Sequence, residues 1–169
     1  MNLTALFKVN YGVYIVSSKN GDKLNGQIGN TVFQVTAEPP QIAISINKDN
    51  LTHEFIEKEG VFSVSILSKE TPLQFIGRFG FRTGRDFDKF EGVKYKLGVT
   101  GAPIVLENTV AYVECRVVKK LDVGTHTIFV GEVVDADIVS SDEPMTYSYY
   151  HEVKRGTTPK NAPVRVESK

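Results

Sequence analysis

Short segments in which apolar and polar residues alternate follow one another along most of the chain. Alternation with a period of two residues is the pattern of a strand with one buried face. Successive strands at short spacing, with helices only in the gaps, favour a mainly β antiparallel barrel over a doubly wound sheet. The expected strands cover residues 11–17, about 30–37, 42–47, 61–67, about 110–119 and about 127–139.

One of these segments, 42–47, has two faces of different character. Its three isoleucines point to one side, as the core side of a strand requires. The other face is small and polar, which suits either a surface on which a flat ligand lies or a solvated sheet face. The residues of that face are Ala43, Ser45 and Asn47.

Turn and helix signals lie between the strands. Asn20-Gly21-Asp22 predicts a tight turn, and Pro39-Pro40 ends the strand before it. One helix is expected over 50–59, with an asparagine as its N-cap and Gly60 as its left-handed end. A second is expected over 71–80, with a proline in its first position and a glutamine placed to close a capping box. The tail after residue 146 predicts a short strand or helix and then an extended segment. If it were a strand, Tyr147 and Tyr149 would share one face.

Composition restricts the classes of function. A chain of 169 residues fits one domain, 1–169, with a real core. Twenty basic residues balance twenty acidic ones, so no overall field favours nucleic acid or an anionic membrane as a partner. The single cysteine, Cys115, excludes an internal disulfide framework and is expected to be a buried thiol. Without a long apolar stretch or the pattern of a signal peptide, a cytoplasmic location is expected.

The start of the helix at 50–59 is a candidate phosphate site. Free amides at Asn50-Leu51-Thr52, the helix dipole and the Thr52 hydroxyl would all favour an anion. The dipole contributes only about 0.3–1 kcal/mol when exposed, so a full cation has to assist it. An ordinary capped helix beside a solvated basic loop is the alternative on spacing alone. The candidate cations are Lys48, Arg78, Arg82, Arg85 and Lys89.

Self-sufficient catalytic side chains do not assemble in the sequence. No histidine pair has metal-ligand spacing with a carboxylate, and no nucleophile motif, phosphate loop or dinucleotide fingerprint occurs. His126 is either a surface turn residue or a group that faces a bound ring. The tyrosines 147, 149 and 150 are either core or interface residues, or one of them stacks on a ring.

The order of several sequence blocks resembles the flavin reductase-like proteins of the FMN-binding split-barrel class, especially flavoredoxins and reductase domains fused to rubredoxin. The resemblance covers about residues 6–163. The blocks are GNTVFQVTAEPPQIAISINKDNLTHEFI, FSVSIL, FIGRFGFRTGRDFDKF, GTHTIFVGEV, MTYSYY and KRGTTPKNAP. This family implies a six-stranded antiparallel Greek-key split barrel with short flanking helices, paired as a homodimer with FMN near the subunit interface.

The resemblance also implies roles for individual residues. His126 would face the reactive side where the nicotinamide docks, and Lys89 would pair with the phosphate. Tyr150, or its neighbour Tyr149, would cover the flavin. The expected contacts to the isoalloxazine are Gln27, Ile28, Gly29, Asn30 and Thr31, and those to the ribityl and phosphate path are Ser45, Asn47, Lys48 and Thr52.

The implied function is an oxidoreductase that takes hydride from NADH or NADPH onto FMN. It would pass electrons to free flavin or to a protein acceptor such as a rubredoxin or a flavodiiron protein. The segment Val35-Thr36-Ala37-Glu38 lacks the serine-rich version found in two-component reductases, which favours a protein acceptor. With one cysteine the chain cannot hold a rubredoxin iron centre itself. Two alternatives are an FMN electron carrier that does not oxidise NAD(P)H directly, and a non-catalytic barrel for another ligand or for haem.

Overall fold

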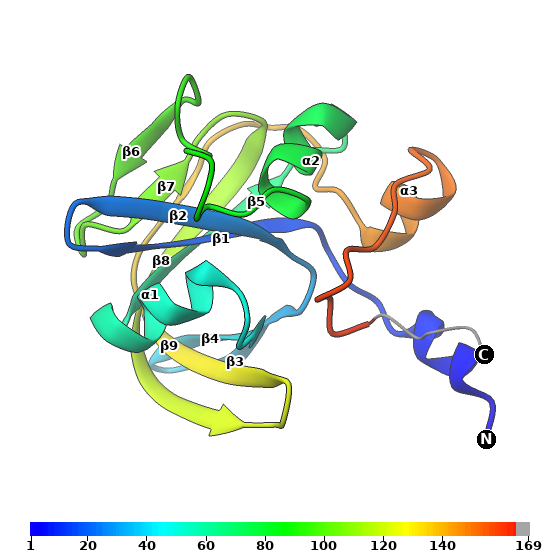
Figure 1. The fold of residues 1–169 in the computed structure, drawn as a ribbon, viewed down its shortest axis with the longest axis horizontal. Helices are drawn as coiled ribbons and strands as arrows, with labels where there is room; N and C mark the ends of the chain where they lie inside the picture. The colour runs from blue at the N-terminus through cyan, green and yellow to red at the C-terminus, as the bar shows by residue number, and fades with distance from the viewer. Residues whose placement is uncertain (165–169) are drawn as a thin grey trace.

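The computed structural model describes residues 1–164 of the chain and contains mainly β structure (Figure 1). Its main sheet is antiparallel, with seven strands in the order β2–β1–β5–β8–β9–β4–β3. A small second sheet pairs β6 with β7. The strands are β1 (Tyr14–Asn20), β2 (Lys23–Gly29), β3 (Val32–Ala37), β4 (Pro40–Asn47), β5 (Val61–Leu67), β6 (Tyr95–Leu97), β7 (Pro103–Val105), β8 (Thr109–Asp122) and β9 (His126–Ile138).

The main sheet thus has one strand more than the expected six. The additional strand is β2, whose sequence KLNGQIG is rich in residues that disfavour strands. It forms because a two-residue turn after Asn20, with Gly21 at φ +57°, returns the chain along β1, and all seven residues of β2 pair with it. Pairing with a neighbour therefore overrides the local preference of this segment.

Apolar side chains pack on both faces of the main sheet, and on the second face they do so over β1, β2 and β5. On one face, Val16, Ile44, Ile46, Phe62 and Phe129 form one buried cluster. On the other, a second cluster extends to the helix after β5 and to the small sheet, and its buried members include Ile15, Leu67, Phe79 and Phe90. The single thiol, Cys115, is buried in the first cluster as expected, and burial raises its pKa to about 12.

The helices are short and lie around the sheet. The 3₁₀ helix η1 (Leu3–Lys8) extends away from the sheet at the N-terminus (Figure 1). α1 (Leu51–Glu59) ends at Gly60 in the left-handed conformation, as predicted. α3 (Tyr147–Glu152) leads into an extended tail. None of the helices within residues 1–164 combines the length and apolarity that crossing a membrane requires.

The predicted capping box of the second helix is wrong. α2 (Leu73–Gly80) begins after Pro72, which is its N-cap residue, and no side chain in the described part of the chain caps it. The hydroxyl of Thr71 instead donates to the carbonyl of Ser68 at 2.6 Å. The Thr71 hydroxyl, which a capping box would require, therefore bonds within the turn before the helix.

Candidate functional site

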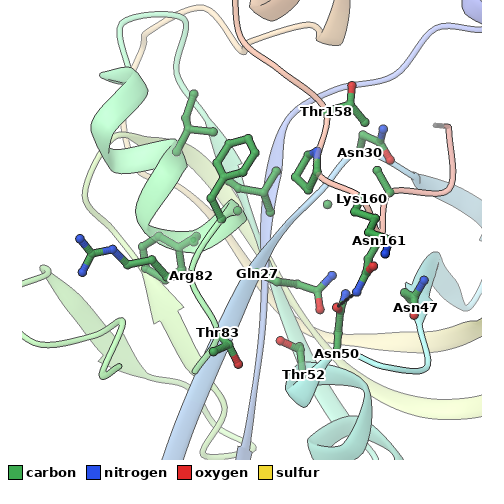
Figure 2. Close-up of a pocket in the computed structure, with 18 of the residues that line it drawn as sticks. Gln27, Asn30, Asn47, Asn50, Thr52, Arg82, Thr83, Thr158, Lys160 and Asn161 are labelled. Atoms are coloured by element: carbon green, nitrogen blue, oxygen red, sulfur yellow. Dashed lines mark hydrogen bonds between the residues drawn. The ribbon is translucent and has the colours of Figure 1, made fainter. Parts of the chain in front are cut away.

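A cavity of about 590 Å³ opens where the sheet curls and β2 comes close to β4. It lies between the end of β2, the end of β4, the start of α1, the end of α2 with the following loop, and the tail (Figure 2). Elements that are distant in sequence thus meet where the edge strand β2 comes close to β4. The residues that line it include Val13, Asn25, Gln27, Ile28, Gly29, Asn30, Ser45, Asn47, Asn50, Leu51, Thr52, Ile76, Phe79, Arg82, Gly84, Lys89, Tyr147, Tyr150 and residues 157–163.

One wall of the cavity is apolar. Ile28 packs against the second core cluster, which includes Val13, Ile76, Phe79 and Tyr150. All five of these side chains also line the cavity. The cavity is therefore continuous with the core on this side, and a flat apolar edge of a ligand would extend it.

The opposite wall is polar. Ser45 and Asn47 lie on the face of β4 that points away from the isoleucines, as the alternation predicts. Asn30 is buried at the end of β2. The Oε1 atom of Gln27 is buried and has no hydrogen-bond partner among the described residues. Because an unpaired buried acceptor costs about 1–3 kcal/mol, a ligand that donates a hydrogen bond there is favoured.

The start of α1 supplies hydrogen-bond donors at one end of the cavity. The amides of Leu51 and Thr52 have no acceptor among the described residues, and Asn50 does not cap the helix. The Thr52 hydroxyl accepts a hydrogen bond from Asn25 Nδ2 at 2.8 Å, so its own proton is left to donate elsewhere. Unpaired amides together with a hydroxyl at a helix N-terminus suit an anion.

Lys89 brings a positive charge to the same cavity. The side chain is buried, with 4% exposed, and its ammonium donates to the carbonyls of Gly26 at 2.8 Å and Phe79 at 3.0 Å. An ammonium has three N–H donors, so one remains for a ligand. Burial lowers the pKa of Lys89 to about 8, which still leaves it mostly charged at neutral pH.

The other candidate cations point elsewhere. Arg78 donates to backbone carbonyls of the loop 88–91. Arg82 lines the cavity, but its guanidinium lies over the ring of Phe87 at 4.4 Å and points away from the cavity (Figure 2). Lys48 donates to Asp122 at 2.6 Å and is not a lining residue.

Arg85 also lies outside this cavity. It pairs with Glu54 of α1, and the hydrogen bond from Arg85 lowers the pKa of that carboxyl group. Among the five candidate cations, Lys89 is therefore the one whose charged group is buried beside the cavity.

The tail closes one side of the cavity, and Asn161 holds it. Its side-chain amide donates to Asn50 Oδ1 at 3.2 Å, which explains why Asn50 does not cap α1 (Figure 2). Its carbonyl lies 3.3 Å from His126 Nε2. His126 Nδ1 lies 2.8 Å from the Thr125 hydroxyl, and burial lowers the pKa of the imidazole. Neutral His126 with its proton on Nε2 satisfies both partners, so His126 contacts the tail.

The turn between α3 and the tail is held by aromatic residues. The Tyr150 hydroxyl donates to the Thr157 carbonyl at 3.0 Å, and the Tyr147 hydroxyl lies 2.6 Å from that of Thr158. Because this segment is a helix, Tyr147 and Tyr150 share a face and stack with ring centroids 6.1 Å apart. The strand arrangement, in which Tyr147 would share a face with Tyr149, is not found. Tyr150 lines the cavity and Tyr149 does not.

The structure brings most of the predicted site residues together. Three do not line the cavity: Thr31, whose hydroxyl lies 3.1 Å from Asn30 Oδ1, Lys48 and His126. The nine that do are Gln27, Ile28, Gly29, Asn30, Ser45, Asn47, Thr52, Lys89 and Tyr150.

Sequence reasoning missed Asn25 and the tail residues 157–163 as parts of the site. The polar stretch Thr157-Thr158-Pro159 was the available signal for the tail, but an extended polar segment does not show where it packs. Asn25 gave no signal, because its role arises from the unpredicted strand β2.

Comparison with known proteins places this arrangement in a family. The family model "Flavin reductase like domain" matches residues 6–158. The ferric-chelate reductase (NAD(P)H) of Archaeoglobus fulgidus is 52% identical over 100% of both chains. The high molecular weight rubredoxin of Moorella thermoacetica is 54% identical over 96% of this chain and 71% of its own length.

The fold agrees with these sequence matches. The solved NADH:FAD oxidoreductase SgcE6 of Streptomyces globisporus C-1027 superposes with a TM-score of 0.77 at 29% identity, covering 85% of each chain. A match of the family model over nearly the whole length, two relatives above half identity and a shared fold lead to one conclusion: the chain belongs to the flavin reductase-like domain family.

Proposed function

We propose that this protein is an NAD(P)H-dependent flavin reductase that holds FMN in the cavity between β2 and β4 and passes the electrons onward. The observation that carries the proposal is the cavity itself, which joins an apolar wall, a polar wall and a cationic end within about 590 Å³. An isoalloxazine ring has an apolar and a polar edge, and a ribityl phosphate extends from it. The apolar wall, the polar wall and the cationic end of the cavity match the apolar edge, the polar edge and the phosphate of this ligand.

Each wall of the cavity would contact a different part of FMN. Phe79 and Tyr150 would contact the apolar edge of the ring, and Gln27 would receive a ring N–H at its unpaired oxygen. Thr52 and Lys89 would bind the phosphate. Bound flavin supplies the hydride-accepting ring and the onward transfer of electrons, so the protein has to supply position, electrostatics and exclusion of water.

We propose that the nicotinamide docks at the side of the cavity that the tail and His126 border. His126 lies next to the tail through the Asn161 carbonyl and is not a lining residue. We therefore assign it to the boundary of the site, where it orients the tail, and the reductant would reach the flavin beside that boundary.

The electron acceptor is proposed from the relatives. One relative is described as a ferric-chelate reductase and another as a high molecular weight rubredoxin. Ferric chelates, free flavin and a rubredoxin-like or flavodiiron protein are the acceptors to compare. Reoxidation of the reduced protein by each, followed by stopped flow, ranks them.

A homodimer is also proposed, on the basis of an exposed apolar face. The register across β3, β4, β9 and β8 places Phe33, Val130, Ile128 and Leu121 on the face that carries Ser45. Phe33 is 53% and Leu121 60% exposed. An apolar surface beside a ligand cavity is typical of an interface. Sedimentation of the wild type and of Leu121→Lys tests it, and a monomeric wild type would contradict it.

The main experiment is an absorption spectrum before and after anaerobic addition of NADH or NADPH. We expect a yellow protein, or one that becomes yellow with FMN, whose visible bands bleach with at least one reductant. Bound FMN that neither reductant bleaches would instead support a pure electron carrier. Failure to bind any flavin would refute the proposal, and a haem Soret band would support the ligand-binding alternative.

A further inference from the structure

A second cavity, of about 960 Å³, lies directly beside the first. Within residues 1–164, Leu51 and Gly84 line both cavities. Leu51 is the first residue of α1, where the phosphate is proposed to bind, and Gly84 belongs to the loop after α2. A ligand that extended beyond its phosphate would therefore meet these two residues first.

Leu51, Gly84 and Asn25 form a wall between the cavities. A Cβ atom built on Gly84 would lie 1.9 Å from Asn25 Oδ1 and 3.2 Å from Leu51 Cδ2. The loop backbone thus lies directly against Asn25 and the first residue of α1, and no ligand chain fits between them. Only a residue without a side chain allows this close approach.

A half-exposed ion pair links the two sides of this wall. Arg85, which follows Gly84, donates to both carboxylate oxygens of Glu54 in the first turn of α1, with NH1–Oε2 at 3.4 Å. A bidentate arginine–carboxylate pair fixes orientation as well as distance. The loop after α2 therefore contacts the first turn of α1, whose unpaired amides face the first cavity.

The second cavity also repels phosphate by its charge. Within residues 1–164, five carboxylates and two cations line it, and one of these cations, Arg85, is already paired with Glu54. Uncompensated like charge beside a phosphate disfavours binding and acts as an element of specificity. The carboxylates are Asp22, Glu54, Asp86, Asp88 and Glu91, and the second cation is Lys23.

We propose that the wall of Leu51, Gly84 and Asn25, with the acidic cavity behind it, makes this protein select FMN over FAD. The inference rests on the proposed function and adds the feature that discriminates between the two flavin nucleotides. FMN ends in a phosphomonoester that fits in front of the wall, whereas FAD continues through a second phosphate to an adenosine. The fold alone does not decide this, because one structural relative is described as an NADH:FAD oxidoreductase.

The test compares the binding of FMN, FAD and riboflavin to flavin-free protein by fluorescence quenching. We expect the wild type to bind FMN at least about tenfold more tightly than FAD. Leu51→Ala and Glu54→Ala should raise the affinity for FAD and narrow this ratio to about threefold or less. Glu57→Ala is the matched control, because Glu57 lies on the same helix and pairs with Lys120 but lines neither cavity.

A second variant separates charge from shape. Asp86 is exposed and makes no side-chain hydrogen bond among the described residues, so we expect Asp86→Asn to keep the fold. It should raise the affinity for FAD and leave that for riboflavin unchanged.

The measured affinities separate failure of this inference from failure of the proposed function. Equal binding of FMN and FAD by the wild type would overturn the inference while leaving the flavin site in place. A ratio that stays at the wild-type value in folded Leu51→Ala, Glu54→Ala and Asp86→Asn would also overturn it. Binding of none of the three flavins would instead refute the proposed function.

Discussion

The two sides of the flavin cavity are built in different ways. The barrel side comes from β2, β4, α1 and the loop that carries Lys89. Its polar groups are fixed by buried hydrogen bonds, such as those from Lys89 to two carbonyls and from Asn25 to Thr52. The tail side is an irregular segment that a few side-chain hydrogen bonds hold to its neighbours. Opening the tail costs little, whereas changing the barrel side disturbs the core. We infer that the barrel side determines affinity and the tail side the rate of exchange.

Lys89→Ala should show the largest effect, because it removes the buried charge from the barrel side. Hydrogen bonds to charged groups contribute about 1.5–3 kcal/mol, which is on the order of 10- to 100-fold in the dissociation constant of FMN. Riboflavin, which lacks the phosphate, should bind almost as well as to the wild type. Titration of both flavins measures the difference, with Lys89→Met retaining most of the side-chain volume. Equal losses for FMN and riboflavin would remove the phosphate role of Lys89.

The pH dependence of binding should identify the same group. Burial lowers the pKa of Lys89 to about 8, so the ammonium is present below that pH and is lost as the pH rises through it. FMN affinity should fall by up to about tenfold per pH unit above pH 8, and riboflavin affinity should not. In the flavin-free protein, by contrast, the contribution of Lys89 to the free energy of unfolding should become more favourable as the pH rises. The unfolded lysine keeps its proton up to its ordinary pKa of 10.5, so the contribution of Lys89 to stability rises between pH 8 and 10.5. A flat ratio of FMN to riboflavin affinity across this range would contradict the assignment.

Asn161→Ala changes the tail side. It should have a smaller effect than Lys89→Ala, and the effect should be on the dissociation rates of both flavins. It removes the hydrogen bond to Asn50, which is typically worth about 0.5–1.5 kcal/mol. We expect the dissociation rates of FMN and riboflavin to rise alike, by about two- to tenfold, because the tail does not distinguish them. Stopped-flow displacement measures these rates. A selective loss of FMN would assign Asn161 to the phosphate end instead.

Lys48→Ala should have the smallest effect. Lys48 pairs with Asp122 outside the cavity, and surface ion pairs of this kind contribute little. The dissociation constant of FMN should stay within about twofold of the wild type. A tenfold loss would show that Lys48 reaches the phosphate when flavin is bound, and would restore the role that its position in the family suggested.

Much of the barrel side could be predicted from the sequence, because its signals are local. The alternation in 42–47 identified the outward face of Ser45 and Asn47, and the helix start at Asn50 to Thr52 was visible as a donor-rich end. Gly60 marked the end of α1. In each case a short-range rule of strand or helix geometry was sufficient.

The rest depended on contacts between distant segments. β2 forms through pairing with β1. The side chain of Asn50 accepts a hydrogen bond from Asn161, more than a hundred residues later, instead of capping α1. Lys48 and Lys89 are both lysines near the predicted site, and only the fold shows that one meets Asp122 and the other two buried carbonyls. The assignment of 1–169 as one domain, the Greek-key connectivity and the cytoplasmic location stay predictions.

Burial makes Cys115, the single cysteine of the chain, an unreactive thiol. The side chain is fully buried, and its pKa of about 12 keeps it protonated, so maleimide reagents will not label it in the native state. A cysteine introduced into the tail, for example at Lys160, would then be the one reactive thiol without any change to the native residue. A fluorophore attached there could report tail opening directly in the working enzyme.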